Sequence, residues 1–480
     1  MDCKNVCGRT LPGHHACIMA PRIALFGGSF NPPGLHHRRI AQALHQHFDL
    51  VLVVPCGPRG DKNTTNILPP VYRAALADMA FEGLPKVEVD LFDLEQDRFT
   101  RSHELDRRYA PRGEVWHVVG VDLTKGGARG EAEIQRFWEH GERLWNTARF
   151  VVLSRPGHAF DPADLPPHHE LLELDIPGSS SAIRELLARG DSVEGLVAPR
   201  PLAYIQRYGL FRAPNPSSWA RGTLAHASYR LQADMDNPKV AAWAHHFSPA
   251  TAGDDAQFIA TLGGDGTMLR CIREHWRERL PFFGVNAGHL GFLMNGAQAV
   301  FATEFPPLDV IFRQLPMLYL EFDDEHGRCQ TAYGFNDAWV ERVTSQSAWL
   351  KVSVNGVIRL PKLVADGALV ATAAGSTAYA RSMGASPLLA DTPAWLLVGS
   401  NVMEPVDWKS ALLSTDTVVE ITCLDPANRP IRAYVDGLDQ GIVHTLRARI
   451  SRAAAAELVF NAHHDMAEKI ATIQFRGTGL

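Results

Sequence analysis

A glycine-rich turn that carries one acidic residue is the stretch of this chain best suited to chemistry. It lies in Thr261–Arg270, which reads TLGGDGTMLR and follows the apolar run Phe258–Leu262. The apolar run predicts a strand, and the residues after the turn have helical spacing. Glycines there leave room for a polyphosphate, and free N–H groups at a helix start favour negative charge. Asp265 would then lie where it can accept a proton from a sugar hydroxyl, although GGDG alone also fits an ordinary Asp-Gly turn.

Three further blocks follow this turn in the chain. They are Asn286–Phe292 (NAGHLGF), Phe335-Asn336-Asp337, and Asp366–Ser386 (DGALVATAAGSTAYARSMGAS), in which an alternating strand leads into a Gly-Ser-Thr turn and a helix start. In this order the four blocks resemble the NAD kinase family, from about Leu224 to the C-terminus. Lipid kinases and phosphofructokinases share GGDG alone, so the GSTAY block separates the chain from them.

The resemblance implies a two-lobed fold and transfer of the γ-phosphate of ATP, with Mg²⁺, to the 2′-hydroxyl of the adenosine ribose of NAD. Asp265 is the candidate base. Residues expected at the phosphates are Gly263, Gly264, Gly266 and Thr267. Residues expected around the dinucleotide are Phe292, Asn336, Asp337, Asp366, Thr377, Ala378, Tyr379 and Ser382. Taken singly, each also fits a turn, a hairpin or a core position, and no protein ligand for a metal is assigned.

A second motif lies near the N-terminus, where the buried strand Arg22–Phe26 breaks into Gly28–His37 (GSFNPPGLHH). A helical pattern and the strand Leu50–Val54 follow, so the segment predicts a βαβ unit with ligands at the carboxyl ends of its strands. The motif resembles the GxFxPxHxGH block of the nicotinamide or nicotinate mononucleotide adenylyltransferases. Other matching blocks are Tyr72-Arg73, Gly120-Val121-Asp122, Arg155-Pro156-Gly157, Gly178–Arg184 and Pro199–Phe211, so the resemblance covers about Pro21 to Arg212.

Only the second histidine of that motif aligns. His37 matches it, whereas Gly34 stands where the family has its first histidine and His36 stands where it has glycine. In adenylyl transfer the protein aligns the phosphates and neutralises their charge. The resemblance assigns this work to His37 with Gly28, Ser29, Phe30, Ser180, Ser181 and Arg184. His36 could replace the missing donor through a shifted loop, and the alternative is a nucleotide-binding domain that no longer catalyses.

The composition is that of a globular chain with small-molecule partners. The 480 residues are 46% hydrophobic and 21% charged, and the net charge of −6 argues against a nucleic-acid binder. The start of the chain, MDCKNVCGRT, lacks the apolar core of a signal peptide, and no apolar run is long enough for a membrane span. Seven scattered cysteines indicate a reducing compartment, so we expect a cytoplasmic protein. Cys3, Cys7 and Cys17 could bind zinc, but an unstructured tail is the preferred interpretation.

The expected fold class is α/β. A tail (1–20) precedes a Rossmann-like nucleotidyltransferase domain with a doubly wound sheet (21–213) and a Pro- and Ser-rich linker (214–222). A kinase α/β lobe (223–316) and a β-rich lobe (317–452) follow, and the segment 453–480 returns to the α/β lobe.

The sequence thus predicts a bifunctional enzyme that adenylylates a pyridine mononucleotide and phosphorylates the resulting NAD. Three alternatives remain: an NAD kinase with a degenerate first domain, a lipid kinase, and a non-catalytic NAD(P) sensor. The expected partners are NAD, ATP and NMN or NaMN, with a homo-oligomer formed through the kinase half. The sequence leaves open whether the mononucleotide is the amide or the acid, and whether polyphosphate can replace ATP.

Overall fold

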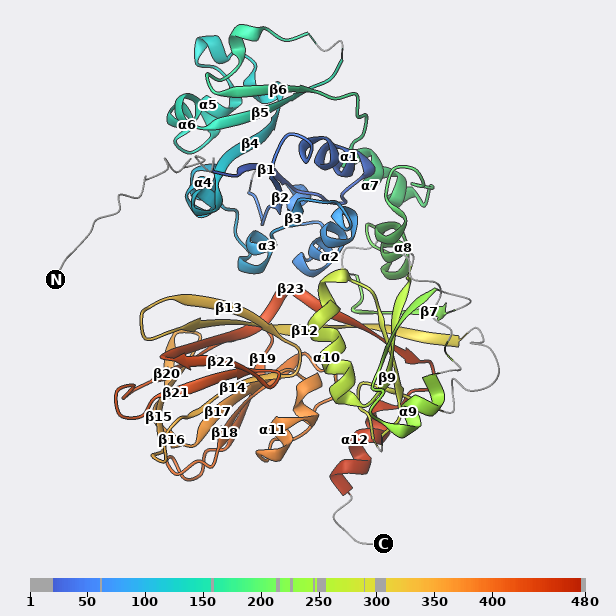
Figure 1. Cartoon of the computed structure of the whole chain (residues 1–480), viewed down its shortest axis with the longest axis vertical. Helices are drawn as coiled ribbons and strands as arrows, with labels where there is room; N and C mark the ends of the chain where they lie inside the picture. The colour runs from blue at the N-terminus through green and yellow to red at the C-terminus, as the bar shows by residue number, and fades with distance from the viewer. Residues whose placement is uncertain are drawn as a thin grey trace, which may run out of the picture.

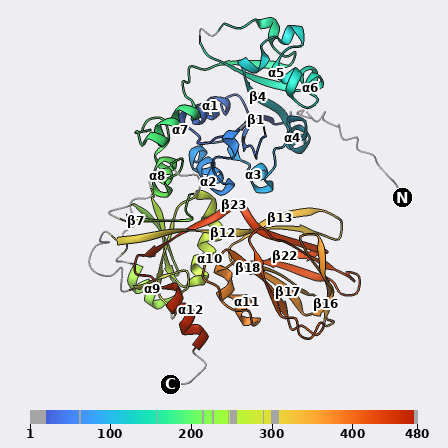
Figure 2. The same cartoon turned by 180° about the vertical axis from the view of Figure 1, so that it is seen from behind.

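The computed structural model describes residues 20–60, 63–156, 159–212, 216–224, 228–244, 247, 256–288, 290–297 and 308–475. Nearly all of the expected tail, with Cys3, Cys7 and Cys17, lies outside these residues, as does His289 of the NAGHLGF block. The chain forms an N-terminal half that lies against a larger C-terminal half, and the contact between them is visible from both sides (Figures 1 and 2).

The N-terminal half is built on a six-stranded sheet in which every pairing is parallel. Its strand order is β3-β2-β1-β4-β5-β6. The strands are β1 Arg22–Gly28, β2 Leu50–Pro55, β3 Val87–Val89, β4 Glu114–Gly120, β5 Arg149–Ser154 and β6 His169–Glu173. The helices are α1 Leu35–Leu44, α2 Pro70–Phe81, α3 Phe92–Gln96, α4 Ser102–Tyr109, α5 Glu133–Phe137, α6 Gly141–Thr147, α7 Ser180–Arg189 and α8 Pro199–Tyr208. The order reverses between β1 and β4, which confirms the predicted doubly wound sheet.

One helix expected near Ile134–Trp145 is instead two short helices, α5 and α6, with a turn between them. His140 adopts a left-handed conformation (φ 58°) immediately before α6. A Cβ on Gly141 would lie 2.0 Å from the carbonyl oxygen of Ile134, so glycine is needed where the two helices cross closely. The periodicity of the apolar residues continued across this turn and concealed it.

The C-terminal half contains two sheets. The first has eleven strands and combines parallel and antiparallel pairings: β7 Trp219–Leu224, β8 Tyr229–Ala233, β9 Phe258–Gly263, β10 Phe282–Asn286, β11 Asn295–Gly296, β12 Leu308–Asp323, β13 Cys329–Gly334, β15 Ala348–Val354, β16 Val357–Ala365, β20 Val418–Cys423 and β23 Thr445–Asn461. The second is a six-stranded antiparallel sheet: β14 Asp337–Arg342, β17 Gly367–Ala371, β18 Ala394–Ser400, β19 Ser410–Ser414, β21 Ile431–Val435 and β22 Leu438–Val443. The helices are α9 Pro238–Trp243, α10 Asp265–His275, α11 Tyr379–Ser382 and α12 Met466–Phe475. These strands confirm the expected α/β fold with a β-rich C-terminal region.

The large sheet joins the two expected lobes of the C-terminal half. Strand β23 pairs with β20 at one end and with β10 at the other, and β12 runs antiparallel along most of its length. Strand β7 also pairs with β12, so the C-terminal part of the expected linker 214–222 belongs to this sheet. The sheet therefore provides one continuous support beneath both lobes.

Three buried carboxylates join the two halves. Asp78 of α2 accepts hydrogen bonds of 2.9 Å from both Arg277 and Arg279, which follow α10. The side chains of Asp78 and Arg279 are both buried, whereas that of Arg277 is half exposed, so the halves are docked through at least one fully buried ion pair.

The other two carboxylates involve β23. Glu95 of α3 forms an ion pair with Arg449 and accepts a hydrogen bond from the hydroxyl of Ser451. Glu457 of β23 accepts hydrogen bonds from two residues of α8, the guanidinium of Arg207 (2.8 Å) and the hydroxyl of Tyr208 (2.6 Å). Each half thus supplies at least one carboxylate to the other.

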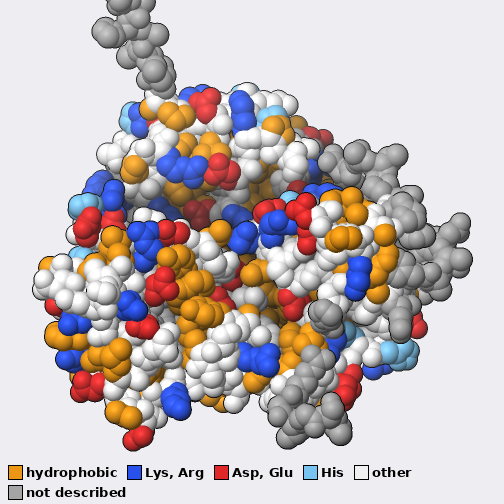
Figure 3. Space-filling view, turned by 60° about the horizontal axis from the view of Figure 1, so that its bottom comes forward, with side chains coloured by type: hydrophobic (Ala, Val, Ile, Leu, Met, Phe, Trp, Pro, Cys, Tyr) orange, Lys and Arg blue, Asp and Glu red, His pale blue; other side chains and the backbone are white. Residues whose placement is uncertain are grey.

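A cleft of about 480 Å³ opens beside this interface, and the surface is hollowed between the two halves (Figure 3). Aromatic side chains line it from both halves, among them Phe92, Trp276, Tyr319 and Tyr333. Elsewhere, no helix in the described part of the chain is long and apolar enough to cross a membrane.

The interface predicts a large stability effect for Asp78→Ala. The variant leaves the side chain of Arg279, which is 4% exposed, without its carboxylate. Removing one partner of a buried ion pair typically costs about 3–5 kcal/mol. Urea unfolding of the full chain checks this.

A matched control is Glu88→Ala, because Glu88 pairs with Arg112 where both side chains are about half exposed. Its cost should stay below ~1 kcal/mol. If both variants lose the same small free energy of unfolding, the Asp78 ion pairs do not stabilise the interface.

Candidate functional sites

Asp265 is the first residue of α10, directly after the turn that ends β9. Its two carboxylate oxygens accept backbone N–H bonds from Phe292 (2.8 Å) and Leu293 (2.9 Å). A Cβ on Gly263 would lie 2.4 Å from Thr267 Oγ1, so the turn can close on Thr267 only with glycine. Cβ atoms on Gly264 and Gly266 would meet nothing within 4 Å, so that face of the turn is open to a ligand.

The loop that Asp265 holds is also tied to α12. Lys469 Nζ donates to the carbonyl oxygens of Gly291 (2.7 Å) and Met294 (2.8 Å). Burial lowers the pKa of Lys469 to about 8, and the charge of Asp265 opposes that shift. The ring of Phe292 is buried and packs against Ile470 and Ile473 of α12 instead of facing solvent. No local sequence pattern indicated Lys469, because its partners are backbone atoms far away in the chain.

Asn336 and Asp337 lie at the start of β14, where the side chain of Asp436 fixes their backbone. The carboxylate of Asp436 accepts the N–H groups of Phe335 (2.7 Å), Asn336 (2.8 Å) and Asp337 (3.1 Å). Burial, followed by the nearby charge of Asp436, raises the pKa of Asp337 to about 7. Oδ1 of Asn336 is buried and has no hydrogen-bond partner in the described part of the chain. An unsatisfied buried amide oxygen of this kind can receive a ligand donor.

The Gly-Ser-Thr segment packs directly on this turn. A Cβ on Gly375 would lie 2.0 Å from the carbonyl oxygen of Asn336. Thr377 donates to the carbonyl oxygen of Ala374, and Ala378, Tyr379 and Ser382 follow it as exposed residues. Strand β17, expected to alternate, is fully buried because the residues on its two faces join two separate cores, one of them with Ala380 of α11.

Tyr379 is the end of a row of aromatic rings. Its ring lies 5.0 Å from that of Trp339 at 69°, and Trp339 stacks on Tyr434 at 4.9 Å and 16°. Tyr379 is 39% exposed. At the end of the row, Tyr379 presents an exposed ring on which a base could stack, and only Tyr379 of its members was a sequence prediction.

The Asp265 turn and the Gly-Ser-Thr segment belong to one structural unit. Met268, Phe335 and Ala374 share one hydrophobic core. Arg273 of α10 also donates to the carbonyl oxygen of Asp436 (3.3 Å). Helix α10 is therefore packed between the two groups of predicted residues.

Within one copy of the protein, Asp366 lies far in space from the other predicted dinucleotide residues. It precedes β17, whereas Asp337 pairs with Ala371 at the other end of that strand, roughly 17 Å away for five extended residues. The carboxylate of Asp366 accepts hydrogen bonds from the side chains of Asn401 (2.7 Å) and Arg342 (2.6 Å), and these contacts lower its pKa.

In the N-terminal half, a buried arginine side chain donates hydrogen bonds to the loop after β1. Arg73, only 1% exposed, donates to the carbonyl oxygens of Ser29 (2.8 Å) and Cys56 (2.6 Å), at the ends of β1 and β2. Phe30 is buried and has a left-handed backbone (φ 41°), with its ring against Gly28. Strained backbone in a ligand loop often marks a functional site.

The start of α7 is tied to the same loop. Ser180 Oγ donates to the carbonyl oxygen of Pro32 (2.8 Å), and Arg184 donates to that of Asn31 (2.7 Å) and to Ser181 Oγ (2.9 Å). The predicted serines and arginine therefore lie beside the predicted glycine-rich loop, with α1 and α7 starting next to each other.

The two histidines lie side by side at the start of α1, with ring centroids 3.9 Å apart. His37 Nδ1 accepts the N–H of Gly34 (3.1 Å), so its Nε2 carries the proton, and burial lowers its pKa to about 3. His36 occupies the space that a side chain at Gly34 would need, since a Cβ there would lie 2.6 Å from His36 Nδ1. A Cβ on Gly178 would likewise lie 2.4 Å from His36. His36 thus lies between the starts of α1 and α7, and His37 lies beside it with its ring against Phe30.

Comparisons with known proteins agree with this division. A family model for the ATP-NAD kinase N-terminal domain matches residues 211–307, and a cytidylyltransferase-like model matches residues 25–186. The chain is 33% identical over 224 residues to an NAD kinase of Rickettsia felis, covering 47% of this chain and 88% of that protein. It is 32% identical over 234 residues to an NAD kinase of Rickettsia bellii, again with 47% and 88% covered. A yeast NADH kinase structure in complex with NADH superposes with a TM-score of 0.42 at 16% identity, over 69% of this chain and 89% of that one.

The raised pKa of Asp337 predicts a pH-dependent stability. Between about pH 4 and pH 7 the folded state binds more protons at this carboxyl than the unfolded state, so its contribution to the free energy of unfolding falls as pH rises. Asp337→Asn removes that contribution, and the variant should gain stability relative to wild type from pH 5 to pH 8. Thermal unfolding at each pH measures the difference.

Asp366→Asn is the control. Because the pKa of Asp366 is lowered, its pH-dependent contribution to the free energy of unfolding changes only at more acidic pH. The stability difference between Asp366→Asn and wild type should be constant from pH 5 to pH 8. A constant difference for Asp337→Asn as well would contradict the assigned shift.

Proposed function

The chain belongs to the NAD kinase family, and from that premise we propose that it is a bifunctional enzyme of NAD(P) synthesis. Its C-terminal half would phosphorylate NAD to NADP with ATP. Its N-terminal half would transfer an adenylyl group from ATP to nicotinamide or nicotinate mononucleotide. The observation that carries the first activity is Asp265 at an open glycine turn, on a helix that shares a core with Phe335 and Ala374.

In the kinase step the ribose 2′-oxygen of NAD attacks the γ-phosphorus of ATP, and the bond to the β,γ-bridging oxygen breaks to release ADP. Asp265 would accept the hydroxyl proton. Its carboxylate oxygens already accept two N–H bonds but keep further lone pairs, so the contacts fix its position without using its full accepting capacity. Mg²⁺ would enter with the ATP phosphates, and the open face at Gly264 and Gly266 has room for them.

The dinucleotide would lie along the exposed side of α11. Asn336 has an unsatisfied amide oxygen for a ribose hydroxyl, and Tyr379 has an exposed ring for a base. Thr377, Ala378 and Ser382 would contact it from the same surface. Asp366 is separated from them by β17, so we propose that it acts across a homo-oligomer formed through the kinase half, in the site of a second copy.

In the adenylyl step a phosphate oxygen of the mononucleotide attacks the α-phosphorus of ATP, and pyrophosphate leaves. Neutral His37 would donate from Nε2 to a phosphate oxygen, and Ser181 with Arg184 would hold the leaving pyrophosphate at the start of α7. The placement of both imidazoles beside that helix start supports a working domain over a degenerate one.

Asp265→Asn should retain NAD binding and lose most NADP formation. General-base catalysis typically contributes 10²–10⁴-fold, so kcat should fall by about 10²-fold or more while the Kd for NAD changes little. Coupled assay of NADP and calorimetric titration with NAD provide the two readouts.

Lys469→Met is the comparison variant, because it loosens the same loop without removing the acid. It should lose far less activity than Asp265→Asn. Equal losses would mean that Asp265 serves only to hold the loop, and phosphorylation of diglyceride instead of NAD would favour a lipid kinase. Binding of NAD by the wild type without turnover would favour a sensor.

The adenylyl step is tested in the full-length Asp265→Asn protein, so that the kinase half does not consume the product. Supplied with ATP and either NMN or NaMN, this protein should release pyrophosphate and form the dinucleotide. His37→Ala should slow this by roughly 10²–10³-fold, the usual cost of one lost transition-state donor.

His47→Ala, an exposed histidine just beyond the end of α1, should leave the rate unchanged. Absence of dinucleotide with both mononucleotides would instead make the N-terminal half a nucleotide-binding domain without catalysis.

A further inference from the structure

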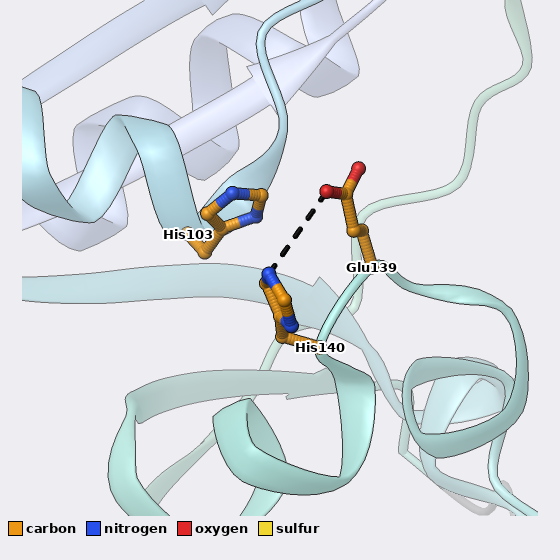
Figure 4. A group of neighbouring side chains, drawn as sticks. All are labelled: His103, Glu139 and His140. Atoms are coloured by element: carbon orange, nitrogen blue, oxygen red, sulfur yellow. Dashed lines mark ion pairs between the residues drawn. The ribbon is translucent and has the colours of Figure 1, made fainter.

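Two histidines and a glutamate from separate parts of the N-terminal half point toward one another (Figure 4). His103 is the second residue of α4, and Glu139 and His140 form the turn before α6. One potential ligand atom from each lies within 4.8 Å of the others. This is the one such group of three that occurs among the described residues.

The group lies at the functional edge of the sheet. Helices α4 and α6 run back to the starts of β4 and β5, so their own starts lie at the carboxyl ends of these strands. The glycine-rich loop after β1 lies at the same edge of the parallel sheet. An ion held there would join α4 to the turn between α5 and α6.

The contacts already made by these side chains leave coordinating atoms free. Nδ1 of His103 is buried and has no hydrogen-bond partner in the described structure. The rings of His103 and His140 meet edge to face, at 4.7 Å and 81°. His140 Nε2 is 3.9 Å from Glu139, too far for a hydrogen bond. A buried imidazole nitrogen without a partner costs free energy, and a metal ion would satisfy it.

We propose that His103, Glu139 and His140 bind one divalent transition-metal ion of the Zn²⁺ type. Imidazole nitrogen and carboxylate oxygen suit such ions, and three protein ligands leave the fourth position to water. Ligand atoms around tetrahedral zinc lie about 3.4 Å apart, given bond lengths near 2.1 Å. The group must therefore close by roughly 1.4 Å at its widest, which the half-exposed side chains of Glu139 and His140 can do by rotating.

Arg101 competes with the ion for the carboxylate. Its Nε lies 3.6 Å from Glu139, and both side chains are about half exposed. Metal binding exchanges this weak surface pair for coordination. Removing the guanidinium should accordingly strengthen binding, an effect that a chance grouping of side chains would not produce.

Co²⁺ titration of the intact chain tests the site. Cobalt bound by nitrogen and oxygen gives weak visible bands without the intense near-ultraviolet band of cobalt thiolate, so the spectrum separates this site from Cys3, Cys7 and Cys17. Wild type should bind one such equivalent, and His103→Ala and His140→Ala should each weaken it by at least tenfold. Arg101→Ala should tighten it, and His47→Ala should leave it unchanged.

A second readout covers any effect of the substitutions on folding. Zn²⁺ should raise the melting temperature of wild type and of His47→Ala but not of Glu139→Gln or His140→Ala. If wild type shows no nitrogen and oxygen-bound equivalent, or if the histidine variants retain it in full, the proposal is wrong. The test is independent of either enzymatic activity.

Discussion

The contact between Asp265 and the backbone N–H groups of Phe292 and Leu293 is the one on which the kinase half depends. It fixes the acid at the start of α10 and at the same time orders the loop that follows β10. Lys469 closes that loop from α12, and Arg273 connects the last turn of α10 to the turn at Asp436. One helix therefore carries the candidate base and positions the residues across from it. A carboxylate held by two N–H donors needs little reorganisation when a substrate arrives.

The same helix ends at the contact with the N-terminal half. Arg277 and Arg279 follow α10 and pair with Asp78 of α2, while Arg73, five residues earlier on α2, holds the ends of β1 and β2. The two candidate sites are thus connected through α2 and the segment that follows α10, which pair through Asp78. A shifted docking of the halves would leave these charges buried without their partners, which is costly.

The sequence predicted the elements whose signal is local. Buried runs such as Leu50–Val54, and helical spacing after a glycine turn, correspond to β2 and α10 because burial on a fixed period is written into neighbouring residues. Contacts between residues far apart in the chain could not be predicted from the sequence. The shared eleven-stranded sheet, Lys469 and Asp436 depend on contacts with distant backbone atoms. The group around His103 was also hidden, because its members are far apart in the chain and a turn interrupts the expected helix near His140.

A structure of the full chain with NAD and a non-hydrolysable ATP analogue tests the central claim most directly. The account predicts the ribose 2′-hydroxyl within about 2.6–3.2 Å of an Asp265 carboxylate oxygen, with the adenosine between the glycine turn and Tyr379. The γ-phosphate should lie over Gly264 and Gly266. Binding of the dinucleotide away from the Asp265 turn, with both carboxylate oxygens still directed only at Phe292 and Leu293, would contradict the proposed phosphorylation mechanism.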